Sequence, residues 1–200
     1  MSFVESKKLQ EHVRKNLNKF QVFFYEYGRF HYDFINIIIH IIFVPIITIT
    51  FDRIFGLLGE KNNLSFNPFY ILYLIVTFLY LYVDIFAGLI TAIQYPLIGY
   101  LLTFIKFEIF GFSQIQSYLF INIFSWIAQF LGHGLFEKRK PALMENIFLT
   151  LNAPCFVNIE LFNFLFNYRK KELEEVRVFI VKDIAIYKKM NDNDNINKSQ

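Results

Sequence analysis

The stretch FINIIIHIIFVPIITITF, from Phe34 to Phe51, decides the fold because it is apolar over nearly the roughly 20 residues that cross a bilayer. Comparable apolar segments follow at Pro68–Val83, Ala87–Ile105, Tyr118–Phe136 and Asn146–Phe166. The whole chain of 200 residues is 55% hydrophobic and 20% aromatic, which is too apolar for a soluble domain of this size. The sequence therefore predicts an all-α, polytopic integral membrane protein.

The last apolar segment differs from the others because polar residues and a proline interrupt it, namely Asn152, Pro154, Asn158 and Glu160. Such residues are tolerated at membrane depth mainly where they face protein or water. We therefore expect four transmembrane helices and a fifth segment that is re-entrant or interfacial.

Lysine and arginine are distributed unevenly along the chain. Six precede the first span, three lie at 138–140 and three at 169–171, whereas only three lie in the loops after the first and third spans. The positive-inside rule then predicts a cytosolic N-terminus, a cytosolic 138–140 loop and a cytosolic tail. No secretory signal peptide is visible, so we expect the N-terminus to be retained.

Amphipathic segments flank the apolar core of the chain. Apolar residues recur at helical spacing through residues 1–30, with basic residues between them, which is typical of a helix on a membrane surface. We divide the chain into a membrane-embedded catalytic domain (1–166, including that basic helix), an amphipathic C-terminal helix (167–190) and a disordered tail (191–200). The single cysteine, Cys155, is expected to be a small buried apolar residue.

Three histidines reach the same leaflet in this topology. His31 and His40 lie where the first span begins, and His133 lies where the fourth span ends. Three neutral imidazoles at one depth could hold a divalent first-row metal ion. In one continuous helix His31 and His40 would lie about 180° and about 13.5 Å apart. The helix must therefore begin after His31, with Asp33 as a reasonable N-cap.

Polar residues accompany these histidines at helical spacing. Asn36 lies one turn before His40, and it suits helix packing or support of a ligand. Gln129 and Glu137 flank His133 at steps of four and share its face if the helix continues through the neighbouring glycines, which could instead break it. The alternative for each histidine is a hydrogen bond to a neighbouring helix.

The run Lys138, Arg139 and Lys140 also allows two interpretations. It can act as a topology determinant facing lipid phosphates, or it can attract a lipid substrate that carries a carboxylate. His12 belongs to the basic N-terminal helix, and we assign it no catalytic role.

Two motifs resemble a known family. WIAQFLGHGLFEKRKPAL, from Trp126 to Leu143, and the pattern Tyr25…His31…Asn36…His40…Pro45 closely resemble the fungal 2-hydroxy-palmitic-acid dioxygenase family over about residues 23–166. This resemblance implies an iron(II)-dependent dioxygenase of the endoplasmic reticulum membrane. Such enzymes use molecular oxygen to shorten a long-chain 2-hydroxy fatty acid by one carbon, a step in phytosphingosine degradation.

The resemblance also implies roles for individual residues. In this interpretation Fe(II) is held by His31, His40 and His133. The supporting catalytic residues are Asn36, Gln129 and Glu137. The substrate carboxylate is bound by Lys138, Arg139 or Lys140.

This chain departs from the fungal motif just after His31. The fungal pattern often reads His-His-Asn-Pro, whereas this chain has Tyr32, Asp33 and Phe34 after His31. If the second histidine of that pattern is a metal ligand, Glu137 or another group must replace it here.

Other classes of protein fit less well. A non-catalytic scaffold or lipid-binding protein of the endoplasmic reticulum needs the same fold and no metal, and it remains the alternative. A desaturase needs about eight clustered histidines, whereas this chain has four. A transporter is disfavoured because no expected span carries paired charges at its centre. We expect the lipid bilayer and no nucleic acid as a partner, and the sequence leaves the oligomeric state open.

Overall fold

The computed structural model describes residues 2–141, 143 and 146–198, and within them it contains helices and loops but no strand. Three segments are long and apolar enough to cross a membrane. They are α3 (Phe34–Lys61), α5 (Ile85–Leu101) continued by η1 (Leu102–Phe104), and α6 (Gln114–Gly132) continued by η2 (His133–Glu137). The other helices are α1 (Ser2–Asn16), α2 (Lys19–Gly28), α4 (Phe69–Val83), α7 (Ile147–Leu151), α8 (Ala153–Phe166) and α9 (Lys170–Lys198).

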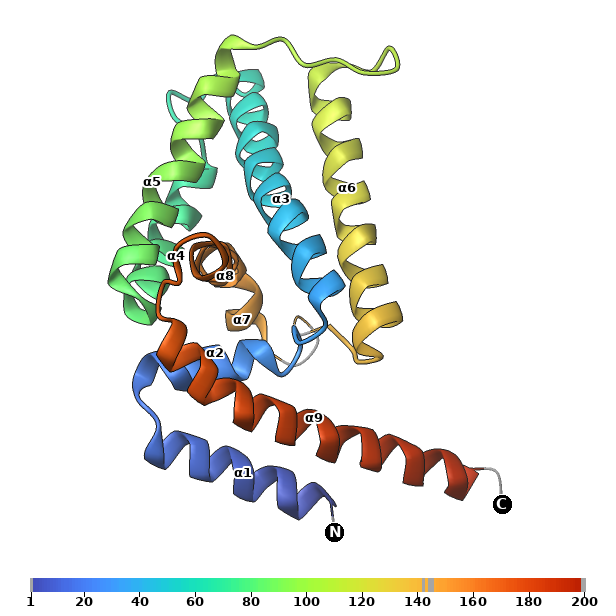
Figure 1. Ribbon diagram of the computed structural model, residues 1–200. Helices are drawn as coiled ribbons and strands as arrows, with labels where there is room; N and C mark the ends of the chain where they lie inside the picture. Colours follow the sequence, from blue (N-terminus) through green and yellow to red (C-terminus); the bar gives the residue numbers. More distant parts are fainter. Residues whose placement is uncertain (1, 142, 144–145, 199–200) are drawn as a thin grey trace.

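Helices α3, α5 and α6 run lengthwise in one bundle, with α4 packed beside α5 (Figure 1). Helix α4 coincides with the second expected span, but its 15 residues extend only about 22 Å, less than the roughly 30 Å of a bilayer core. The structure therefore supports three helices of spanning length, and the four-span topology stays a prediction.

Helix α3 is longer than the sequence predicted. It continues to Lys61, so Asp52 and Arg53 lie inside the helix and are buried rather than in a loop. The Asp52 carboxylate packs against Gly99 of α5, where a Cβ atom would collide with it. Asn67, just before α4, donates to the Asp52 carbonyl at 3.0 Å. Asp52 and Arg53 lie toward the far end of α3 rather than at its centre, so the expectation that no span carries paired charges at its centre stays a prediction.

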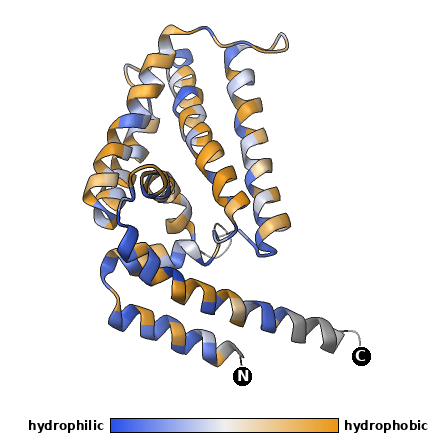
Figure 2. Ribbon diagram, viewed as in Figure 1, coloured by the Kyte–Doolittle hydropathy of each residue, from blue (hydrophilic) through white to orange (hydrophobic). Residues whose placement is uncertain are grey.

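The N-terminal segment forms two helices rather than one. The break falls at Asn18, whose side chain caps α2 in a reciprocal pair with Gln21. Helices α1 and α9 lie side by side below the apolar bundle, and their apolar and polar residues alternate (Figure 2). Val13 of α1 is fully buried in one cluster with Val176 and Ile180 of α9. The apolar stripe of α1 is thus covered by α9, although the sequence predicted a helix lying on the membrane.

The fifth apolar segment is divided at Asn152 into α7 and α8, and Pro154 lies at the start of α8. Helix α8 lies across the bundle, is seen end on in Figure 1, and packs against α3 and α5. The polar residue Asn158 of α8 faces α5. Its side-chain amide donates to Thr91 Oγ1 at 2.7 Å and accepts from Gln94. A helix in this orientation suits a segment that does not cross, which stays a prediction.

The C-terminal helix α9 continues to Lys198, beyond the expected boundary at Met190. Residues 199–200 of the expected disordered tail lie outside the described residues, and the disorder of 191–200 stays a prediction. Cys155 is buried in α8, as expected.

Candidate metal centre

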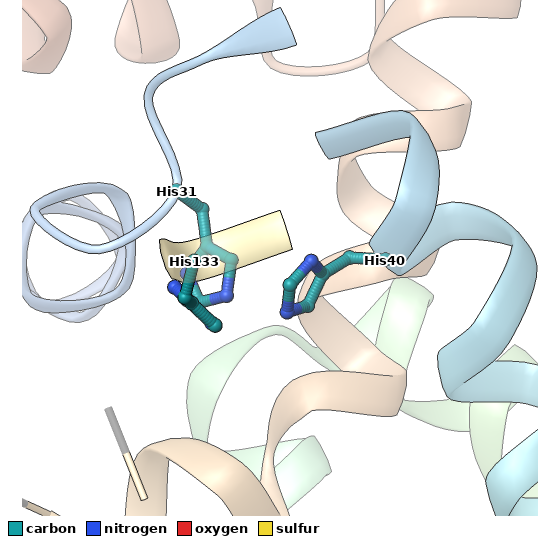
Figure 3. A group of neighbouring side chains, drawn as sticks. All are labelled: His31, His40 and His133. Atoms are coloured by element: carbon teal, nitrogen blue, oxygen red, sulfur yellow. The ribbon is translucent and has the colours of Figure 1, made fainter. Parts of the chain in front are cut away.

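Three histidines from three separate elements meet at the lower end of the bundle. His31 lies in the turn before α3, His40 on the second turn of α3, and His133 at the start of η2. Their imidazole rings point toward one another (Figure 3), and one nitrogen from each lies within 4.8 Å of the others. All three side chains are buried. The arrangement could hold a metal ion, and it brings together the three histidines that the sequence predicted as ligands.

The start of α3 brings His31 back toward His40. The side chain of Asp33 accepts the backbone N–H of Ile35 at 2.9 Å, so Asp33 is the N-cap that the sequence predicted. The chain turns before this cap, which leaves His31 outside the helix. The ring centroids of His31 and His40 are consequently 4.3 Å apart rather than on opposite sides of one helix.

Backbone carbonyl groups orient two of the imidazoles. His31 Nδ1 lies 3.0 Å from the Tyr27 carbonyl oxygen, and His40 Nδ1 lies 2.9 Å from that of Asn36. A carbonyl oxygen only accepts, so each Nδ1 carries the proton and each Nε2 keeps its lone pair for a ligand. Burial, followed by the neighbouring histidines, lowers the pKa of His31 well below its usual value, so this imidazole is neutral at pH 7.

The third imidazole offers an unused nitrogen. His133 Nδ1 is buried and has no hydrogen-bond partner, which would be costly in a purely structural histidine. A ligand at this position would satisfy it. Three neutral imidazole nitrogens suit iron, zinc, copper or nickel, and they leave further coordination positions open. The residues present therefore fit a divalent transition metal.

Glu137 links the two segments that carry His31 and His133. Its Oε1 atom accepts the backbone N–H groups of Tyr32 and Asp33 at 2.7 and 2.8 Å. It also accepts the side-chain amide of Asn36 at 3.1 Å. Glu137 is therefore engaged in holding the histidine-bearing turn, and Asn36 supports it from α3.

The helix widens rather than breaks at the glycines around His133. Residues 133–137 form a π-helical turn that ends at Lys138, which adopts a left-handed conformation with φ of 51°. At Gly132 a Cβ atom would lie 2.5 Å from Asn36 Oδ1, so glycine lets α6 approach α3 without displacing the Asn36 side chain. Both the π-turn and the glycine contact help to bring His133 beside His40.

Tyr27 is a site residue that the sequence analysis missed. Its ring stacks on His31 with the centroids 4.1 Å apart and the planes 11° apart, and Phe156 of α8 covers its other face at 4.6 Å. Its backbone carbonyl also orients the His31 ring. The spacing of four residues before His31, on a helix, was the available signal.

A cavity of about 350 Å³ opens directly onto the three histidines. Gln129 lines it near them, and its Nε2 atom is buried without a hydrogen-bond partner. Nearly all the other lining residues are apolar or aromatic side chains of α3, α4, α6 and the α7–α8 segment. The volume falls within the roughly 300–1,000 Å³ of ordinary small-molecule sites. The cavity suits a largely hydrocarbon ligand with one polar end at the histidines.

The basic triplet lies outside this cavity. Arg139 is buried, with its guanidinium 4.3 Å from the centre of the Phe30 ring and 4.4 Å from that of Tyr187. Lys138 and Lys140 are exposed and line a shallow hollow, which shares Phe130 and Pro141 with the histidine cavity. The two lysines thus lie next to the cavity rather than in it, and the Arg139 guanidinium lies between two aromatic rings.

Asp183 of α9 is a second residue that the sequence analysis missed. It accepts from Arg29 Nε at 2.9 Å, lies 3.5 Å from Arg139 NH1, and is only 2% exposed. Arg139 also donates to the Arg29 carbonyl at 3.0 Å. Helix α9 therefore holds together the turn before His31 and the loop after His133. The available signal was the position of Asp183 in the sequence, because this acidic residue interrupts the apolar stripe of α9 three residues after Ile180.

The fold and the site define a class of helical protein with membrane-length helices and a buried triple-histidine centre that opens onto an apolar cavity. The family model described as "2-hydroxy-palmitic acid dioxygenase Mpo1-like" matches residues 17–164, and the chain belongs to this family. The match includes all three clustered histidines and ends before α9.

One curated relative is the 2-hydroxy-palmitic acid dioxygenase MPO1 of Saccharomyces cerevisiae. It is 32% identical over 147 residues, which cover 73% of this chain and 78% of the yeast protein. No solved structure matches the chain significantly. The relationship supports a role in the metabolism of 2-hydroxy fatty acids.

Proposed function

We propose that this protein is an iron(II)-dependent dioxygenase that shortens long-chain 2-hydroxy fatty acids by one carbon. The observation that carries this proposal is the cluster of His31, His40 and His133, with nitrogen lone pairs available, at the polar end of an apolar cavity. The yeast relative is described as a dioxygenase for 2-hydroxy-palmitic acid, a substrate with one polar end and a long acyl chain.

The proposed reaction balances without a further reductant. The bond between C1 and C2 of the 2-hydroxy acid breaks, C2 becomes the carboxyl carbon of the shortened acid, and C1 leaves as carbon dioxide. One molecule of oxygen takes up the four electrons, and one water forms. Ferrous iron, when bound, supplies the redox chemistry that allows oxygen to react with an organic acid.

The residues of the site have distinct tasks in this proposal. His31, His40 and His133 hold the metal, while Glu137 and Asn36 keep the ligand-bearing turn in position. The free amide of Gln129 donates a hydrogen bond to the polar end of the substrate. The apolar cavity holds the acyl chain and excludes water from the reacting end.

The route of the substrate follows from the position of the two lysines. Lys138 and Lys140, exposed beside the cavity, attract the carboxylate from the membrane surface, whereas Arg139 is buried beside Asp183 and serves to hold the loop. We further propose that the protein resides in the endoplasmic reticulum membrane with its N-terminus in the cytosol. There it would act in the degradation of phytosphingosine.

The test is a comparison of two acids of equal length. Iron-loaded protein should consume oxygen and release the shortened acid from a 2-hydroxy fatty acid, while the unsubstituted acid binds but gives no shortened product. The hydroxyl group contributes to positioning, so the discrimination appears in turnover more than in affinity. Equal shortening of both acids would contradict the role of the hydroxyl. No turnover of either acid by iron-loaded protein would favour a lipid-binding protein without catalytic activity.

A further inference from the structure

The cavity is elongated along one face of α3. Six residues of α3 line it, and each lies one to four positions beyond the previous one, starting at the metal centre. They are His40, Val44, Ile47, Thr48, Phe51 and Phe55. Fifteen residues of helix separate the first from the last, which corresponds to about 22 Å. An acyl chain advances by somewhat less than one C–C bond of about 1.5 Å for each carbon, so this length fits about fifteen carbons or more.

Two hydroxyl groups along this path are already hydrogen-bonded within the protein. The Thr48 hydroxyl donates to the Val44 carbonyl at 3.0 Å, and the Tyr73 hydroxyl donates to the Thr91 carbonyl at 2.6 Å. These two hydroxyl protons are thus used within the protein, and most of the remaining lining residues are apolar or aromatic. A hydrocarbon chain is the occupant that this lining suits.

The end of the cavity away from the histidines is built from aromatic rings. Phe51 and Phe55 have centroids 6.3 Å apart, Phe55 and Phe69 lie 6.4 Å apart, and Phe69 and Tyr73 lie 5.5 Å apart. We call these four residues the aromatic end wall. Helices α3 and α4 provide all of them, and none comes from α6 or α8.

The aromatic end wall is fixed where α4 begins. Asn67 donates to the Asp52 carbonyl on α3 at 3.0 Å, and its side-chain oxygen accepts the backbone N–H of Phe69 at 3.0 Å. These two bonds connect the first turn of α4 to α3 next to Phe51. The position of the Phe69 ring relative to the metal centre is therefore set by the fold.

We propose that the aromatic end wall limits the length of the acyl chain that the site accepts. A chain with its polar end at the histidines extends along α3 and meets Phe55 and Phe69 at its methyl end. This inference rests on the proposed function for the identity of the substrate, and it adds the residues that select its length.

The test enlarges the far end of the cavity in one variant and fills the middle of the cavity in another. Phe55→Ala should shift the preferred 2-hydroxy acid toward longer chains by about two to four carbons, because removing the ring leaves space for additional methylene groups. Thr48→Phe, or Ile47→Phe if that variant does not fold, should shift the preference toward shorter chains. Phe78→Ala on α4 is the control, since Phe78 is 67% exposed and does not line the cavity.

Two measurements are made on each variant with a series of 2-hydroxy acids of different length. One is the amount of shortened product from iron-loaded protein, and the other is displacement of a fluorescent fatty acid from iron-free protein. Shifts in the binding profile without turnover of any acid would contradict the proposed reaction and still support the length limit. An unchanged profile in both cavity variants would overturn the length limit and indicate that the chain leaves sideways past Leu72, which is 49% exposed.

Discussion

The side chain of Glu137 accepts the backbone N–H of Tyr32 at 2.7 Å, although 105 positions separate the two residues. The same oxygen accepts from Asp33 and Asn36, so the turn that carries His31 is tied to the π-helical turn that carries His133. The separation of these two histidines therefore depends on a residue that is itself outside the cluster.

Replacing Glu137 should weaken the metal centre without removing a ligand. Glu137→Ala leaves two backbone N–H groups without their acceptor, and we expect metal affinity to fall by about 10- to 100-fold. Glu137→Gln keeps an acceptor oxygen and should lose much less. Titration of the metal-free variants with iron(II) against a chelator of known affinity measures this, and wild-type affinity in Glu137→Ala would contradict it.

The two glycines around His133 provide a matched pair of variants. In Gly132→Ala the added Cβ meets Asn36 Oδ1 at 2.5 Å, so either the buried Asn36 side chain or α6 must shift, at a cost of about 1–3 kcal/mol. In Gly134→Ala the added Cβ meets no atom within 4 Å. Thermal unfolding in detergent should show a lower Tm for Gly132→Ala alone. A similar Tm for both variants would mean that the close approach at Gly132 is unimportant.

Much of the metal centre could be predicted because its determinants are local in sequence. The spacing of His31 and His40 required a helix that starts between them, and Asp33 supplied the cap that confirmed this start. The partners of Glu137 could not be predicted, because a hydrogen bond to backbone N–H groups leaves no pattern in the side chains. The π-turn after Gly132 likewise depends on packing between α6 and α3.

The terminal helices were harder to predict because an apolar stripe does not reveal what covers it. The stripe that contains Val13 suits a membrane surface and the stripe of α9 equally well, and the structure pairs the two helices. The length of α3 was underestimated for a related reason. Asp52 resembles the end of a span in sequence, and only the neighbouring Gly99 and Asn67 make its burial possible.

Asp183 should be essential for stability. Asp183→Ala removes the shared carboxylate of the half-buried Arg29 and the buried Arg139, and breaking such a buried pair typically costs about 3–5 kcal/mol. We expect Tm to fall by about 10 °C for a chain of this size. Glu174→Ala, at an exposed position of the same helix, is the control and should leave Tm unchanged. Equal Tm values for the two variants would show that α9 does not hold the two loops through Asp183.

The topology prediction can be tested with inserted glycosylation sites. A site placed at the N-terminus or directly after Lys140 should remain unmodified, because both segments are expected on the cytosolic side. A site in the loop between η1 and α6, residues 105–113, should be modified. Glycosylation after Lys140 would reverse the predicted orientation of the histidine cluster.

The central claim is that His31, His40 and His133 together hold one catalytic iron ion. The most direct test is the iron content per polypeptide of anaerobically loaded wild-type protein, the His133→Ala variant and the His12→Ala variant. His12 is exposed and outside the cluster, so its variant should match the wild type at about one iron ion per chain. His133→Ala should lose nearly all of its iron while still accumulating in the membrane. Full iron occupancy in His133→Ala would contradict the account.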